Sequence, residues 1–167
     1  GGRPDTVMAM TGNYLRDIEA EDFGAVVIRF KNGAIGIVEG SACVYPKNLE
    51  ETLSIFGETG TAVIGGLAVN RIQTWNFKDS APQDEEVKKL SGNDPKDVYG
   101  SGHNALYRNF ILSARAGRAP LVSGEEGIKG MKIILAAYKS QKTGMPVKYD
   151  GLEFSSTDMS PSDVKVR

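Results

Sequence analysis

Apolar and polar residues alternate with a period of two along much of the first half of the chain. From Ala25 to Phe30, the larger apolar residues occupy every second position, as in a strand with one wetter face. Asn32-Gly33 follows and is a strong hairpin signal. The return segment carries Gly36, Val38 and Gly40 on one face, a strip that indicates close packing. These signals predict strands near residues 7–11, 25–30, 34–42, 52–55, 61–64 and 71–77.

In the last third, the spacing of the apolar residues changes to the three-and-four pattern of a helix. Residues 104–116 place apolar side chains on one stripe, and Gly117 supplies a stop signal. A second helix is expected to begin at Ser123, which forms a capping-box pattern with Glu126. Its predicted apolar stripe is Ile128, Met131, Ile134, Leu135 and Tyr138.

Strands first and helices last predict an α+β fold, with a mainly antiparallel, open-faced sheet and helices packed on one face. The other face then needs a partner. Residues 78–101 are polar and lack periodicity, so we interpret them as a long surface loop. We expect residues 1–149 to form one domain, with a short edge strand near Val147. Residues 150–167 are expected to be a loosely held polar tail.

Composition and charge exclude several classes of function. The 167 residues carry 20 Lys and Arg against 21 Asp and Glu, so no overall field attracts nucleic acid or an anionic membrane. No apolar run reaches the length that spans a bilayer. The single cysteine, Cys43, cannot form an internal disulfide, which favours a cytoplasmic location. A start at Gly1 without Met suggests a chain cut from a longer protein.

Few residues are candidates for chemistry. One His and one Cys cannot supply the usual metal ligands, so no metal site is expected. The stretch 100–105 matches G-x-G-x-x-A but lacks a buried strand before it and an acidic residue about 20 positions later, so it predicts no cofactor site. A Cys43–His103 nucleophilic pair is formally possible, but a buried, inert thiol is the commoner outcome for a cysteine at the end of an apolar strand.

His103 is the best candidate for ligand binding, since it lies just before a helix where free amides attract anions. Helix capping or a surface hydrogen bond is the equally open alternative. Tyr107 lies one turn further along. Tyr45 and Lys47 place an aromatic ring and a cation in one turn. These four residues are the predicted substrate-binding set, and no residue is predicted to be catalytic.

Several stretches together resemble the C-terminal domain of the Gfo/Idh/MocA family, the glucose–fructose oxidoreductase and inositol dehydrogenase type. The resemblance covers residues 1–149 and is carried by Glu21-Asp22 with residues 27–33, by Gly57-Glu58-Thr59-Gly60-Thr61, and by residues 102–147. It implies a dihydrodipicolinate-reductase-like domain that follows a Rossmann domain binding NAD or NADP. The sheet of such domains usually builds the subunit interface of a homo-oligomer and helps to cover the site of a sugar, nucleotide sugar or polyol.

The family's Gly-rich nucleotide loop, its Lys-Pro pair and its helix with catalytic Asp and His are absent from this sequence. The resemblance therefore implies the substrate-side and oligomerisation domain of an NAD(P)-dependent dehydrogenase, with no Rossmann domain, cofactor site or catalytic residue of its own. His103 matches a family His near the substrate cleft, so a contact role carries over. The alternative is a stand-alone, non-catalytic α+β module for protein–protein interaction.

Overall fold

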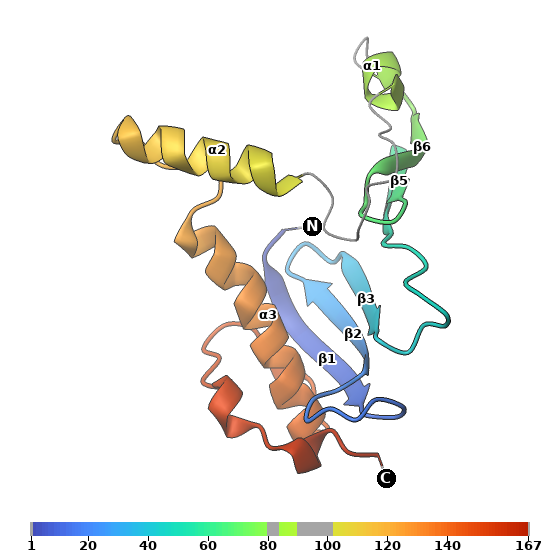
Figure 1. Ribbon diagram of the computed structural model, residues 1–167, viewed down its shortest axis with the longest axis vertical. Helices are drawn as coiled ribbons and strands as arrows, with labels where there is room; N and C mark the ends of the chain where they lie inside the picture. Colours follow the sequence, from blue (N-terminus) through green and yellow to red (C-terminus); the bar gives the residue numbers. More distant parts are fainter. Residues whose placement is uncertain (1, 80–83, 90–101, 167) are drawn as a thin grey trace. The chain divides into compact units, whose positions relative to one another are not determined.

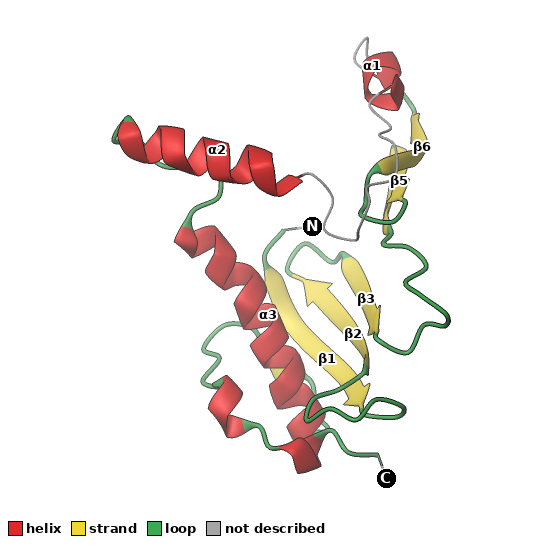
Figure 2. Cartoon of the chain, viewed as in Figure 1, coloured by secondary structure: helices red, strands yellow, loops and turns green. Residues whose placement is uncertain are grey.

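The computed structural model describes residues 2–79, 84–89 and 102–166. The chain divides into two compact units, the first formed by Gly1–Cys43 with Val122–Arg167 and the second by Val44–Leu121. Strands dominate the first half of the chain and the long helices follow, so the predicted α+β class is confirmed (Figures 1 and 2). The predicted strands appear in two separate antiparallel sheets.

The first unit is built on a four-stranded antiparallel sheet with strand order β3-β2-β1-β7. The Asn32-Gly33 hairpin joins β2 to β3 as predicted. Gly33 takes a backbone φ of 87°, which residues other than glycine rarely adopt. The strands are β1 (Pro4–Gly12), β2 (Phe23–Phe30), β3 (Ile35–Ser41) and β7 (Val147–Lys148).

Helix α3 (Gly124–Thr143) lies along one face of this sheet (Figure 1). Its buried residues are Ala136, Ala137 and Ser140. The predicted stripe is wrong for three of its five members, because Ile128, Met131 and Ile134 are about half exposed, whereas Leu135 and Tyr138 are partly buried. Small side chains are buried because they let the helix backbone approach the sheet closely. They form a core with Val7, Ala9, Ile28 and Val147.

Ser123 caps α3 by accepting a hydrogen bond from the Glu126 amide at 3.3 Å. The other half of the predicted capping box does not form, because the Glu126 carboxylate pairs with Lys129. The opposite face of the sheet is not covered by α3, and we name it the open face. Met8, Val27 and Ile37 lie side by side at its centre.

The free edge of β1 is completed by side chains and by the C-terminal segment. Strand β7 pairs only with Thr6 and Val7, so the edge continues beyond it. There the Ala9 amide donates to Ser140 Oγ at 3.0 Å, and the Thr11 amide donates to Gln141 Oε1 at 2.8 Å. Asn13 continues the series with a bond to the Val164 carbonyl. Helix α3 therefore supplies the hydrogen-bond acceptors that a longer neighbouring strand would otherwise provide to the β1 amides.

The expectation of a loosely held tail beyond residue 150 is wrong. The tail folds into two 3₁₀ turns, η1 (Ser156–Asp158) and η2 (Pro161–Asp163), each with a capping box. Its Val164 side chain is only 5% exposed, and Lys142 of α3 pairs with Asp163 at 3.4 Å. The cause is local, because Ser and Asp side chains at the start and end of each turn form hydrogen bonds with its backbone amides. The turns are stabilised in this way, and Val164, which follows the second turn, is buried.

The second unit contains an antiparallel sheet of order β4-β5-β6. The predicted turn at residues 57–60 joins β4 to β5, and a side chain at Gly60 would collide with the Phe77 ring at 2.1 Å. The elements are β4 (Leu53–Gly57), β5 (Gly60–Gly65), β6 (Arg71–Phe77), α1 (Asp84–Lys89) and α2 (Gly102–Arg115).

Helix α1 corrects the expectation of an unstructured loop over residues 78–101, of which 80–83 and 90–101 lie outside the described residues. Three acidic residues in its first turn favour the positive end of a helix dipole. The predicted apolar stripe of α2 is present but stays exposed: Leu106, Phe110 and Ile111 are 43–57% accessible.

Candidate functional site

His103 and Tyr107 occupy the first two turns of α2, as their spacing predicts. Their ring centroids lie 6.3 Å apart with a tilt of 33°, and Tyr107 is 61% exposed. Both rings are therefore accessible to a ligand near the helix N-terminus. No acidic residue lies in the first turn of α2, so no side chain of that turn opposes the partial positive charge of the helix N-terminus.

Tyr45 and Lys47 lie in the segment that leads toward β4. Tyr45 is 92% exposed and precedes Pro46 through a cis peptide bond. Within the described residues, no hydrogen bond or ring contact joins Tyr45 or Lys47 to His103 or Tyr107. The structure thus brings together one predicted pair and leaves the substrate-binding role of all four residues a prediction.

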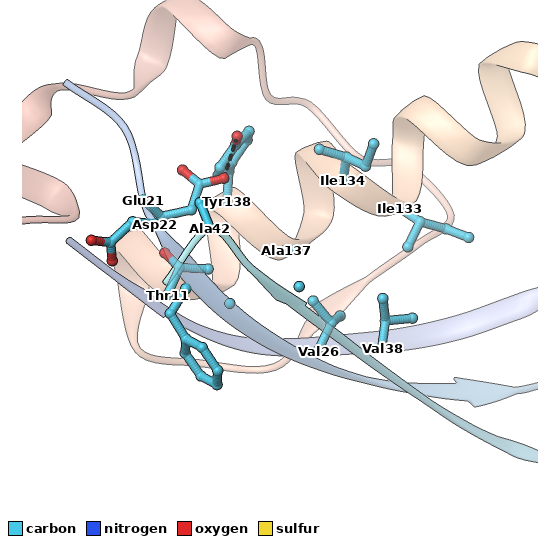
Figure 3. Close-up of a pocket in the computed structure, with 13 residues that line it drawn as sticks. Thr11, Glu21, Asp22, Val26, Val38, Ala42, Ile133, Ile134, Ala137 and Tyr138 are labelled. Atoms are coloured by element: carbon cyan, nitrogen blue, oxygen red, sulfur yellow. Dashed lines mark hydrogen bonds between the residues drawn. The ribbon is translucent and has the colours of Figure 1, made fainter. Parts of the chain in front are cut away.

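The structure also reveals a pocket in the first unit that the sequence did not predict. It is a hollow of about 320 Å³ between α3 and the small-residue strip of the sheet (Figure 3). Val26, Val38 and Ile133 give it apolar walls, and Gly24 and Gly40 form part of its lining. In the sequence, the strip of small residues on β3 indicated close packing, but among the described residues it lines this pocket. The strip is thus the sequence signal from which the pocket could have been inferred.

One end of the pocket is polar because Asp22 lies there. Asp22 is only 2% exposed and accepts backbone hydrogen bonds from Tyr14, Leu15 and Arg16 at 2.6–2.9 Å. Burial opposes ionisation of this carboxyl, but the three amides outweigh it and lower its pKa to about 2. Asp22 therefore holds the loop between β1 and β2 in shape as a permanent anion at neutral pH.

Two further polar groups line the pocket near Asp22. The Tyr138 hydroxyl donates to Glu21 Oε1 at 2.9 Å (Figure 3), and its pKa is raised by burial and by that hydrogen bond. Thr11 Oγ1 is buried and has no hydrogen-bond partner among the described residues. Glu21 and Asp22 are thus engaged in structural bonds, and this arrangement suits packing rather than acid–base chemistry.

Cys43 behaves as a structural thiol. Its Sγ donates to the Asp22 carbonyl oxygen at 3.6 Å, and burial, followed by the neighbouring Asp22, raises its pKa. A raised pKa keeps the sulfur protonated and weakly nucleophilic. This agrees with the interpretation of an inert thiol rather than a nucleophile.

The second unit carries a hollow lined by aromatic residues. Trp75 and Phe77 pack edge to face with centroids 5.1 Å apart, and Trp75 Nε1 donates to Asp84 Oδ1 at 2.9 Å. Thr59 and Asp79 complete the lining. In the part of the chain that the structure describes, no group of His, Cys, Asp and Glu residues is arranged to hold a metal ion. None of its described helices is long and apolar enough to cross a bilayer.

Residues 1–149 match the oxidoreductase family C-terminal alpha/beta domain of the Gfo/Idh/MocA type. The chain therefore belongs to this family, and the resemblance noted from the sequence is confirmed. The match ends where the tail begins, so the folded segment from residue 150 onward lies outside it.

Solved structures extend the comparison. The WlbA dehydrogenase of Chromobacterium violaceum, in complex with NADH and UDP-GlcNAcA, is 37% identical with a TM-score of 0.77, covering 88% of this chain and 40% of that protein. The Bordetella pertussis WlbA dehydrogenase, with the same ligands, is 35% identical with a TM-score of 0.82, covering 92% of this chain and 43% of that protein.

A curated relative points to the same family. Myo-inositol 2-dehydrogenase of Thermotoga maritima is 28% identical over 130 residues, which are 77% of this chain and 36% of that enzyme. The chain thus spans about two fifths of the length of the relatives it matches.

Proposed function

We propose that this chain is the substrate-side and oligomerisation domain of an NAD(H)-dependent dehydrogenase whose substrate is a nucleotide sugar. The observation that carries the proposal is the likeness to two WlbA dehydrogenases, at 35–37% identity and TM-scores of 0.77–0.82 over about nine-tenths of the chain. Both were solved with NADH and UDP-GlcNAcA, an anionic nucleotide sugar. A neutral sugar or polyol, such as the substrate in the name of the myo-inositol relative, is the competing class.

The start of α2 supports an anionic substrate. Its N-terminus carries partial positive charge, its first turn has no acidic residue, and the exposed His103 and Tyr107 side chains belong to its first two turns. His103 would donate a hydrogen bond to the substrate, and Tyr107 would pack against it. In this proposal hydride transfer to nicotinamide takes place on residues outside this chain, and the domain orients the substrate for it.

The domain's second role is self-association. Strands β1–β3 expose large apolar side chains on the open face, and an exposed apolar sheet surface normally marks an interaction site. A symmetric pair of identical copies is the commonest way to bury such a surface. The same face would also suit the alternative, a stand-alone module for protein–protein interaction. Dehydrogenase activity of the protein that contains this domain is therefore the property that separates the two hypotheses.

The test is an NADH-formation assay on the enzyme that contains this domain, with UDP-GlcNAcA and myo-inositol as competing substrates. We expect kcat/KM to be at least about a hundredfold higher for UDP-GlcNAcA, since a site built for charged groups rejects an analogue that lacks them. A preference for myo-inositol would overturn the substrate class. Calorimetric titration of the 167-residue chain alone should show no saturable binding of NAD(H) or NADP(H), because no strand–turn–helix for the pyrophosphate is found among its described residues. Micromolar binding of either cofactor would contradict the proposal that this domain orients the substrate while other residues bind the cofactor.

A further inference from the structure

The open face of the first unit has an ordered pattern of apolar and charged residues. Met8, Val27 and Ile37 are paired across β1, β2 and β3 and form a central row. Their side chains are 38%, 47% and 77% exposed, and Ile37 is the most exposed of the three. The row is continuous because side chains at paired positions of neighbouring strands share one face.

Two charged residues without an ion-pair partner among the described residues lie on opposite sides of this row, one on β2 and one on β3. Arg29 follows Val27 by two residues on β2 and is paired with Ile35. Glu39 follows Ile37 by two residues on β3 and is paired with Ala25. Because β2 and β3 are antiparallel, the two charges lie toward opposite ends of the strands. Both side chains are exposed, and within the described residues neither has an ion-pair partner. Lys148, at the β7 edge, is already paired with Asp5 at 2.9 Å.

Two symmetric arrangements stack this face on a second copy with the strands of the two copies aligned. If the two-fold axis runs along β2, each row lies over the same row of the partner, so Arg29 meets the partner's Arg29 while Glu39 faces an uncharged residue. If the axis runs across the strands through the central row, each strand lies over its own copy in the reverse direction. Glu39 then lies over the partner's Ile35, one strand spacing of about 4.8 Å from the partner's Arg29.

We infer that two copies stack open face to open face about a two-fold axis across the strands, with Glu39 of each copy bonded to the partner's Arg29. Packed sheets lie about 10 Å apart, a gap that a Glu and an Arg side chain together span. The arrangement forms the same ion pair twice, whereas the other axis brings like charges together. This inference rests on the self-association included in the proposed function and adds its symmetry and its specific contact.

Charge variants of the 167-residue chain separate the two axes. Sedimentation equilibrium from about 1 to 100 µM gives the dimer dissociation constant of each variant. With the axis across the strands, Arg29→Gln weakens the dimer; with the axis along β2, it relieves a like-charge contact and strengthens the dimer. Arg29→Glu should raise the constant at least about tenfold. Adding Glu39→Arg to Arg29→Glu should restore it. Lys132→Glu, an exposed change on α3, is the matched control and should leave the constant unchanged.

Cross-linking gives a second readout that does not depend on charge. In a Cys43→Ser background, Val27→Cys lies opposite itself about either axis and should be joined by a short bis-maleimide. Ile37→Cys lies opposite itself only when the axis crosses the strands, because the other axis places it over the partner's Met8. Equal cross-linking of both variants supports the inference, and cross-linking of Val27→Cys alone overturns it.

The outcomes also separate this inference from the proposal beneath it. A monomer at 100 µM, a concentration at which a standard interface should hold, overturns self-association and this contact together. A dimer that is unaffected by Arg29→Glu, or one that Arg29→Gln strengthens, overturns only the contact and its axis. The NADH-formation assay tests the dehydrogenase function independently of either result.

Discussion

Removing the Ser140 hydroxyl should destabilise the first unit more than so small a change would suggest. Ser140 is completely buried, and its Oγ accepts the Ala9 amide at 3.0 Å on the edge of β1 that β7 does not reach. Ala9 itself is only 5% exposed, so water cannot replace the hydroxyl. Ser140→Ala therefore leaves a buried backbone donor without a partner.

The magnitude follows from three contributions. An unsatisfied buried donor costs about 1–3 kcal/mol. Alanine has a better helix propensity than serine, which returns about 0.5 kcal/mol in α3. The cavity left by one oxygen atom adds little. The expected loss in the free energy of unfolding is about 1–2 kcal/mol, which for a chain of 167 residues lowers Tm by roughly 2–8 °C.

The assay is thermal and urea unfolding of the 167-residue chain followed by circular dichroism, and Ser113→Ala is the matched control. Ser113 is also buried on a helix, at 2% exposed, but among the described residues its hydroxyl accepts no amide from a strand. The same chemical change there should shift Tm by far less. Hydrogen exchange gives a local readout, because the Ala9 amide should lose protection in Ser140→Ala.

Equal shifts in Tm for the two variants would refute the reasoning, because the loss would then reflect any buried hydroxyl. An unchanged Tm for Ser140→Ala with an unchanged exchange rate at Ala9 would refute it more directly. Both results would mean that the edge of β1 does not depend on α3.

Two further predictions concern the candidate site and the pH dependence of folding. The folded-state pKa of Asp22, about 2, lies below its ordinary value of 3.8. The stability that Asp22 contributes is therefore complete above about pH 4 and is lost as the pH falls toward 2. Asp22→Asn should reduce that acid-induced loss in urea titrations, and a pH profile identical to that of the unchanged chain would contradict this prediction. His103→Ala in the parent enzyme should lower kcat/KM by the loss of one hydrogen bond, about 0.5–1.5 kcal/mol, without changing Tm; a lower Tm with unchanged kinetics would assign His103 a structural role instead.

Local sequence signals predicted most of the elements and their order. Asn32-Gly33 and residues 57–60 marked two hairpins, and Ser123 and Gly144 marked the two ends of α3. These signals succeed because turn and cap residues act on their immediate neighbours, through φ > 0 at glycine or a side-chain bond to a nearby amide. The α+β class and the family followed from the same stretches.

The face that α3 buries was decided only by the tertiary structure. The sequence pattern favoured the bulky stripe with Ile128 and Met131, but Ala136, Ala137 and Ser140 pack on the sheet. Hydrophobicity ranks side chains one at a time, whereas burial depends on how closely two backbones approach, and small residues permit the closest approach.

The sequence by itself determined the order of the strands and of the two long helices, which class of fold they form, and that His103 and Tyr107 share the start of one helix. Only the tertiary structure decided that Asp22 is a buried anion, that the tail folds onto α3, and that Arg29 and Glu39 flank one apolar row. The physical reason is distance along the chain. Turns and caps are settled between residues a few positions apart, but the contacts from Ala9 to Ser140 and from Asn13 to Val164 join segments more than a hundred residues apart. No local pattern encodes those contacts, because the partner of each group is chosen by the packing of the whole unit.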